Sequence, residues 1–196
     1  MNDKNPKAVL LISGKRKSGK DFCVDLLTNE LSDYVVFRIA GPIKKQFAKD
    51  HNLDFDKLLD STQYKEDYRQ QMVEWSENIR KTDPNFFLRL AIDESNARSK
   101  SIWILSDARR LCDIEYFKTS EEFQNTTILS IRICASIETR VERGWAFTPG
   151  IDDKETECGL DSYRDWNYVI DNDGSDEELI QKLEPIIELI KTKLKN

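Results

Sequence analysis

The chain has 196 residues, with 36 acidic and 30 basic side chains and a formal net charge of −6. This length suits one domain with a full hydrophobic core, and the acidic balance argues against a nucleic-acid-binding protein. One histidine, His51, excludes a histidine triad or a multi-histidine metal site, and four widely spaced cysteines suggest neither a zinc site nor a disulfide framework.

Short apolar runs predict strands, and the segments between them predict helices. Strands are expected at 8–13, 35–40, 102–107, 128–134 and 168–171. Helices are expected at about 20–31, 43–51, 64–81, 85–95, 113–119, 137–143 and 176–194. Strands that alternate with helices predict an α/β fold of three layers, in which helices flank a parallel five-stranded sheet. In such a sheet ligands bind beyond the carboxyl ends of the strands.

The first expected strand runs into a phosphate-binding loop (P-loop). Gly14 follows the strand, four residues intervene, and Gly19-Lys20 opens the first helix. Glycines let backbone N–H groups point at a phosphate, and the helix N-terminus adds positive potential. This order predicts a nucleoside-triphosphate enzyme. The expected nucleotide-binding residues are Gly14, Lys15, Arg16, Lys17, Ser18, Gly19, Lys20 and Asp21.

Two features of this loop are unusual. Asp21 stands where a serine or threonine normally gives Mg²⁺ a hydroxyl, and a carboxylate is also a hard oxygen ligand. Lys15, Arg16, Lys17 and Lys20 place four cations within six residues, and cations this close repel one another unless anions compensate them. We therefore expect a site for more phosphate charge than one nucleotide supplies. A solvated basic turn is the alternative.

Two long connections interrupt the expected sheet. About sixty residues separate the second and third strands, too many for a plain crossover, and 136–165 carries the glycines of a mobile lid. We expect a single domain with a core of about 1–43, 96–135 and 165–196, an acceptor-binding insertion of about 44–95 and a lid of about 136–164. Within the insertion, the stripe formed by Tyr64, Tyr68, Met72, Trp75 and Ile79 indicates core packing.

Charged residues follow the third expected strand directly. Asp107 is expected to orient Mg²⁺ or its water shell, and Arg109 and Arg110 can clamp a phosphate. Surface ion pairing with Asp113 and Glu115 is the alternative.

Arg140 and Arg143 lie three residues apart and share one face of the helix expected at 137–143. We expect both to close over the transferred phosphoryl group as arginine fingers. Pairing with Glu138 and Glu142 along the same helix is the alternative.

Three further cations have two interpretations each. Arg132 lies inside the fourth expected strand, where it serves either an interior ion pair or a ligand. Arg80 ends a helix, where it reaches the acceptor or complements the helix dipole. Lys44 follows the turn expected at Gly41-Pro42 and lies at the sheet edge or in solvent. Near the C-terminus, Pro185 is expected to kink or split the last helix.

These motifs resemble those of the animal-type phosphomevalonate kinases. The blocks that carry the resemblance are Lys15-Arg-Lys-Ser-Gly-Lys-Asp-Phe22, Gly41-Pro-Ile-Lys44, Tyr64-Lys-Glu66, Asp83-Pro84 with Phe86-Phe87, Ser106-Asp107 with Arg109-Arg110, Arg143-Gly-Trp145, Phe147-Thr-Pro-Gly150 and Glu157-Cys-Gly-Leu-Asp161. The loop with Asp21 at its end and the Arg143-Gly-Trp145 lid are the specific parts.

The resemblance implies the nucleoside monophosphate kinase fold and ATP-dependent phosphorylation of (R)-5-phosphomevalonate to the diphosphate. Catalysis is assigned to Lys20, Lys15, Lys17 and Arg16, and Mg²⁺ to Asp21 and Asp107. The resemblance places Arg80, Arg109 and Arg110 at phosphomevalonate, with Lys17, Lys44 and Arg132 as further candidates, and Arg140 and Arg143 at ATP. An acceptor phosphate is already anionic near neutral pH, so no strong general base is required.

The sequence leaves other readings open. A different small-molecule kinase on the same fold is the first rival, and a nucleotide-dependent switch is the second. We expect a monomer that binds neither nucleic acid nor a membrane. The polar start of the chain does not resemble a signal peptide, which favours the cytosol, and the C-terminal Lys-Leu-Lys-Asn lacks the peroxisomal tripeptide of some relatives.

Overall fold

The computed structural model describes residues 5–60 and 63–195 and contains the expected parallel sheet. Its strands are β1 (Ala8–Gly14), β2 (Tyr34–Phe37), β3 (Ile102–Leu105), β4 (Thr127–Cys134) and β5 (Tyr168–Asp171). They lie in the order β2-β3-β1-β4-β5, and every neighbouring pair is parallel. The expected limits of the core at residues 1 and 196 fall outside the described residues.

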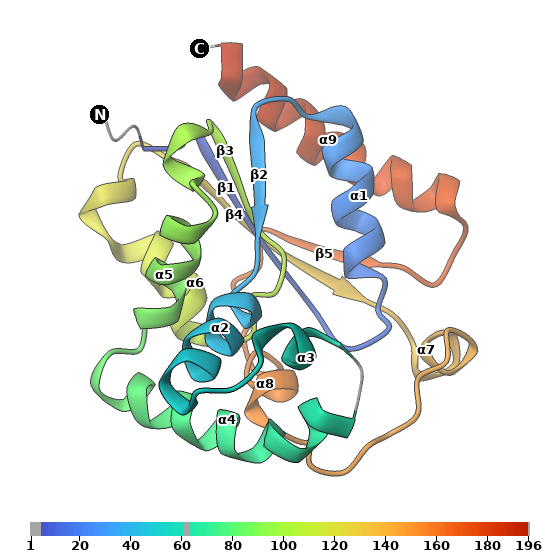
Figure 1. The fold of residues 1–196 in the computed structure, drawn as a ribbon. Coiled ribbons are helices and arrows are strands. Elements are labelled where there is room, and N and C mark those ends of the chain that lie inside the picture. Colours follow the sequence, from blue (N-terminus) through green and yellow to red (C-terminus); the bar gives the residue numbers. More distant parts are fainter. Residues whose placement is uncertain (1–4, 61–62, 196) are drawn as a thin grey trace.

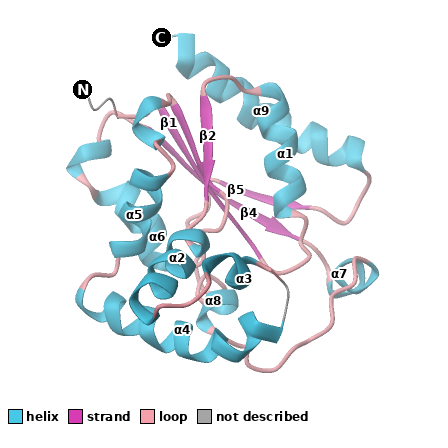
Figure 2. Ribbon diagram, viewed as in Figure 1, coloured by secondary structure: helices cyan, strands magenta, loops and turns pink. Residues whose placement is uncertain are grey.

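Helices cover both faces of the sheet (Figure 2). On one face α1 (Lys20–Glu30) and α9 (Asp176–Lys195) pack against Leu10 and Ile12. On the other, α5 (Phe86–Glu94) and α6 (Leu111–Thr119) pack against Val9 and Leu11. Side chains alternate between the faces of a strand, so β1 is buried on both sides, and the loop after it starts from a rigid point.

In the β2–β3 segment (38–101), α2 (Ala40–His51), α3 (Phe55–Leu59) and α4 (Gln63–Thr82) form a helical layer beyond the carboxyl ends of the strands (Figure 1). The segment then returns to β3 through α5, on the face of the sheet, and the short η1 (Ala97–Ser99). The aromatic stripe of α4 packs where the sequence predicts, because Tyr64, Tyr68, Met72 and Trp75 join a cluster around Phe47 and Leu58. The five-residue α3 was not predicted.

The β4–β5 segment (135–167) is mostly irregular. It contains α7 (Ile137–Glu142) and the four-residue α8 (Glu155–Cys158), which the sequence did not predict. Earlier in the chain, the short η2 (Glu121–Phe123) connects α6 to β4. Figure 1 shows α7 to the side of the sheet and α8 among the helices of the β2–β3 segment.

The second expected strand, 35–40, ends three residues too late. β2 ends at Phe37, and Ala40 already begins α2, so Gly41 and Pro42 occupy a first helical turn and not the turn that was expected. A proline is tolerated there because the first N–H groups of a helix need no intrahelical partner. Asp107 explains the early helix start, since its carboxylate accepts from the backbone N of Ile39 at 2.9 Å and of Ala40 at 3.1 Å.

Pro185 does not split the last helix, which runs from Asp176 to Lys195. The proline removes one backbone hydrogen bond, but Leu183, Ile186 and Ile187 are buried around it and anchor both halves on the sheet. None of the helices in the described part of the chain combines the length and apolar composition of a membrane span.

Candidate functional site

The loop between β1 and α1 has P-loop geometry. Gly19 adopts a left-handed conformation with φ of 86° immediately before α1, and Lys17 is also left-handed with φ of 62°. A Cβ on Gly14 would lie 2.5 Å from the Ser18 Oγ and 2.8 Å from the Ile133 carbonyl oxygen, so glycine is required for close packing as well. The loop therefore connects the end of β1 to the N-terminus of α1 in the conformation that the glycine spacing predicts.

A cavity of about 220 Å³ opens on this loop. Its lining consists of Lys15, Lys17, Gly19, Lys20, Asp21 and Arg143. The Lys20 Nζ lies 3.3 Å from Asp21, whose carboxylate also pairs with Arg38 at 3.0 Å. The structure thus brings together most of the nucleotide-binding residues expected from the sequence, with Arg143 from the distant β4–β5 segment.

Arg143 and Asn172 both form hydrogen bonds to the backbone of the P-loop. Arg143 donates from Nη1 to the Ser18 carbonyl oxygen at 3.3 Å and from Nη2 to that of Asn172 at 2.8 Å. Asn172 donates from Nδ2 to the Ser18 oxygen at 2.9 Å. Sequence reasoning missed Asn172, and its place directly after β5 was the only available signal. Ser18 itself is buried, and its Oγ has no partner among the described residues.

Carboxylates of the β4–β5 segment neutralise two of the four loop cations. Lys15 pairs with Asp161 at 2.6 Å, and Arg16 pairs with Asp152 at 2.9 Å. Glu157 accepts from the backbone N of Arg16 at 3.0 Å. The sequence predicts that phosphate compensates these cations, with a solvated basic turn as the alternative. In the structure protein carboxylates compensate Lys15 and Arg16, while Lys15, Lys17 and Lys20 line the cavity.

Arg140 has a different position from Arg143. It is buried, its guanidinium lies 4.1 Å from the centroid of the Trp145 ring, and its Nε donates to the Arg16 carbonyl oxygen at 2.8 Å. Trp145 in turn donates to Asp152 at 3.1 Å. Arg140 therefore supports the loop without lining either cavity, and both arginines bond to backbone oxygens and not to Glu138 or Glu142.

Burial would raise the pKa of Asp152, but four partners lower it below its usual range. The Trp145 indole and the backbone N of Thr148 donate to its carboxylate, and the charges of Arg16 and Arg140 stabilise it. Asp152 is therefore a stable anion that ties the β4–β5 segment to the P-loop.

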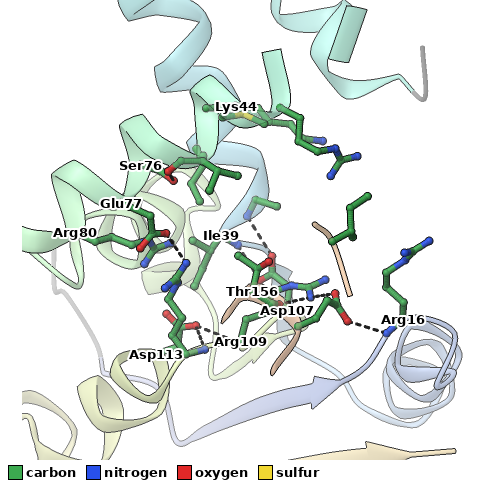
Figure 3. A pocket seen from close by; sticks show the side chains of 18 of the residues that line it. Arg16, Ile39, Lys44, Ser76, Glu77, Arg80, Asp107, Arg109, Asp113 and Thr156 are labelled. Carbon is green, nitrogen blue, oxygen red and sulfur yellow. Dashed lines mark hydrogen bonds and ion pairs between the residues drawn. The ribbon is translucent and has the colours of Figure 1, made fainter. Parts of the chain in front are cut away.

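A second cavity of about 420 Å³ lies between α2, α4, the turn after β3 and the β4–β5 segment (Figure 3). Its lining is rich in cations: Arg16, Lys44, Lys65, Arg69, Arg80, Arg109 and Arg110. Apolar side chains also line it: Ile39, Ala40, Ile43, Met72, Val73 and Ile151. Such a surface suits a small anionic molecule with an aliphatic part.

Lys65 and Arg69 were missed by sequence reasoning. They lie four residues apart on α4, which places them on one helix face, and this spacing was the available signal. Burial lowers the pKa of Lys44, and the charges of Lys65 and Arg69 lower it further. These three cations therefore create a positive potential that a bound anion would relieve.

Arg109 and Arg110 pair with acids from other segments. Arg110 bonds to Glu77 of α4 and lies 3.0 Å from Glu155 of α8, while Arg109 bonds to Glu157 of α8. The alternative of ion pairing with the Asp113 and Glu115 side chains is not what is seen. Asp113 instead caps α6, because its carboxylate accepts from the backbone N of Arg109 and of Arg110, both at 3.0 Å. Burial raises the pKa of Asp113.

Arg80 lies at the side of the second cavity. Burial lowers the pKa of its guanidinium, which lies 5.1 Å from the Phe87 ring centroid. Its Nη1 donates to the Pro84 carbonyl oxygen at 3.3 Å, whereas its buried Nε has no partner among residues 5–60 and 63–195. Arg80 is thus a half-buried cation at this cavity whose guanidinium is incompletely bonded by the described residues.

Arg132 has the interior partners that the sequence left as its alternative. Its Nη1 donates to the Ser13 Oγ at 2.9 Å, and its Nη2 pairs with Asp161 at 2.9 Å. It joins β4 to β1 and to the β4–β5 segment and is absent from the linings of both cavities.

Comparisons with known proteins show which family the chain belongs to. The model of the phosphomevalonate kinase family matches residues 12–125. A phosphomevalonate kinase from Drosophila melanogaster is 42% identical over 177 residues, which cover 89% of this chain and 91% of that protein.

A solved structure shares the fold at low sequence identity. The crystal structure of TT1252 from Thermus thermophilus matches with a TM-score of 0.54 and 17% identity, over 94% of this chain and 98% of that one. A shikimate kinase from Acinetobacter baumannii matches with a TM-score of 0.48 and 13% identity, over 96% of each chain. The motifs, the family model and the Drosophila relative establish that this chain belongs to the phosphomevalonate kinase family.

Proposed function

We propose that this kinase transfers the γ-phosphoryl group of ATP to the phosphate of (R)-5-phosphomevalonate, which yields the diphosphate and ADP. The observation that carries the proposal is the position of the second cavity. Arg16 of the P-loop contributes to its lining, while Lys15 and Lys17 line the neighbouring donor cavity. One loop thus lies between a nucleotide-type site and a cation-rich site of suitable size for a small polyanion.

The donor would lie on the P-loop. Lys20 is well placed to bridge the β- and γ-phosphates, because its Nζ lies at the cavity beside the N-terminus of α1. Lys17 and Arg143 line the same cavity and would add positive charge. Catalysis would then rest on positioning and on neutralising phosphate charge, and the acceptor phosphate would need no base to ionise it.

The cavity also suggests how the acceptor is oriented. Its phosphate must approach the P-loop, where Arg16 and Arg109 line the cavity. Lys44 lies on the opposite side in Figure 3, in the field of Lys65 and Arg69. These lysines and Arg69 would bind the carboxylate of the substrate, and the apolar lining of α2 and α4 would contact its carbon chain.

The residues present are compatible with Mg²⁺. The Asp21 carboxylate is exposed at the donor cavity, and Mg²⁺ in such sites needs only one or two carboxylates in addition to phosphate oxygens and water. Asp21 would hold the ion, and Asp107, already bonded to two backbone N–H groups, would act through its remaining oxygen lone pairs. The ion would supply charge neutralisation between the phosphates.

We propose that the β2–β3 segment binds the acceptor and that the β4–β5 segment acts as a lid.

Both cavities are lined by residues of one chain, which supports a monomer as the working unit. The cytosolic location stays a prediction from the sequence. Size-exclusion chromatography with light scattering, and imaging of a fluorescent fusion, would test these two points.

The function is tested by ADP release with Mg-ATP and a panel of acceptors. (R)-5-Phosphomevalonate, mevalonate, AMP, UMP and no acceptor would be compared at equal concentration. Turnover with phosphomevalonate alone is expected. Turnover with a nucleotide would instead indicate another small-molecule kinase, and ADP release without any acceptor would indicate a nucleotide switch.

A further inference from the structure

We propose that Glu157 is a positioning residue that holds the P-loop and the Arg109 guanidinium in one fixed relation, an inference that rests on the proposed function. Glu157 belongs to the sequence block 157–161, to which neither the motif analysis nor the proposed reaction assigns a role.

The two oxygens of Glu157 serve two different parts of the site. Oε2 accepts from the backbone N of Arg16 in the P-loop at 3.0 Å. Oε1 accepts from Nη1 of Arg109, which follows β3. The side chain is only 5% exposed, so water competes little for either bond. One carboxylate therefore connects segments that are more than ninety residues apart in sequence and that face the donor and the acceptor.

The same helix also restrains Arg109 through its backbone. The Thr156 carbonyl oxygen accepts from Nη1 at 2.7 Å, so both bonds of this nitrogen end on α8. Within the described part of the chain, Nε and Nη2 of Arg109 have no bonded partner. Glu157 thus fixes one edge of the guanidinium and leaves the other available for an acceptor phosphate.

This arrangement matters because in-line transfer depends on small distances. A displacement of about 1 Å between reacting groups can cost about 100-fold in rate. Without Glu157 the loop and Arg109 would be held by separate elements, and their relative position would vary. The effect should fall on kcat, since the contacts to each substrate would remain.

A competing role for Glu157 predicts the opposite result. If the carboxylate only occupied Arg109 until phosphate displaced it, its removal would improve acceptor binding. KM for phosphomevalonate would then fall, and kcat would stay unchanged. A lower kcat would therefore indicate positioning, and a lower KM for phosphomevalonate at unchanged kcat would indicate competition.

The test is a double-mutant cycle with Glu157→Gln and Arg109→Gln, measured by steady-state kinetics with ATP and (R)-5-phosphomevalonate. Glutamine keeps an oxygen for the Arg16 N–H but loses the charge that pairs with Arg109. We expect kcat of Glu157→Gln to fall about 10- to 100-fold, with KM for ATP changed less than about 3-fold. The double variant should be no slower than Arg109→Gln, because the two residues act as one unit.

Glu142→Gln is the matched control, since Glu142 is an exposed carboxylate of α7 outside both cavity linings. It should leave the kinetics unchanged. Additive effects in the cycle, or a lower KM for phosphomevalonate at full kcat, would overturn the proposal. If the wild-type chain does not use phosphomevalonate, the proposed function has failed and not the cycle.

Thermal unfolding of each variant would accompany the kinetics. Should Glu157→Gln fail to fold, Glu157→Asp provides the second variant, because it keeps the charge and is shorter by one methylene. An aspartate can maintain only one of the two bonds, so a reduced kcat in a folded protein is expected. Loss of folding in both variants would show that Glu157 has a purely structural role and would contradict the proposal.

Discussion

Asn172 donates its side-chain amide to the Ser18 carbonyl oxygen at 2.9 Å, across 154 residues of sequence. The same Nδ2 would lie 2.2 Å from a Cβ built on Gly19. The end of β5 therefore packs directly on the turn of the P-loop. The loop conformation depends on an amide at position 172 as well as on the glycine at position 19.

Gly19→Ala should impair the P-loop for two reasons. The φ of 86° is strained for alanine, and the new methyl group would push Asn172 away from Ser18. We expect a loss of about 1–3 kcal/mol in the free energy of unfolding and weaker ATP binding. Gly150→Ala is the matched control, because Gly150 has φ of 77° with open space around it. Equal losses in denaturant unfolding of the two variants would disprove the role of the Asn172 contact.

Lys20→Met should abolish most turnover. The Lys20 Nζ lies in the donor cavity beside Asp21, and methionine keeps an unbranched side chain one atom shorter while it removes the charge. We expect kcat to fall by a factor of about 100–1,000, as for the loss of other groups that stabilise transition-state charge. Lys49→Met, at an exposed position of α2, serves as the control. Near-normal ADP release by the Lys20 variant would refute the assignment.

Arg110→Ala should mainly weaken acceptor binding. The Arg110 side chain is nearly buried in the second cavity, between Glu77 and Glu155. Its removal leaves these carboxylates unpaired near the acceptor, so KM for phosphomevalonate should rise about 30-fold or more. KM for ATP should change little. Arg89→Ala, on α5 outside both cavity linings, should have normal values, and a change confined to KM for ATP would argue against the placement.

Lys44 should make acceptor binding sensitive to alkaline pH. Burial and the charges of Lys65 and Arg69 lower the pKa of Lys44, so the amine loses its proton at a lower pH than an ordinary lysine. Only the protonated form attracts an anion, and KM for phosphomevalonate should therefore rise with pH through this lowered pKa. Lys44→Arg should remove that rise, because arginine stays protonated up to about pH 12. Identical pH profiles of KM for the two proteins would count against Lys44 as an acceptor contact.

The local patterns of the sequence determined most of the architecture. Apolar runs located all five strands, and the glycine spacing located the P-loop. These features depend on residues close in sequence, where periodicity and backbone preference act. The boundary at Ala40 was wrong because a distant carboxylate, Asp107, starts that helix early. Of the two outcomes expected for Pro185, a split of the last helix is wrong, because tertiary packing outweighed the local preference of the proline.

By itself, the sequence determined the strand order along the chain, the P-loop and the resemblance to one kinase family. Only the tertiary structure decided which charges meet. It paired Lys15 with Asp161 and Arg16 with Asp152, placed Lys65 and Arg69 at the second cavity, and brought Glu157 between the P-loop and Arg109. Such ion pairs join segments far apart in sequence, and their partners are chosen by the path of the folded backbone, which no local pattern encodes.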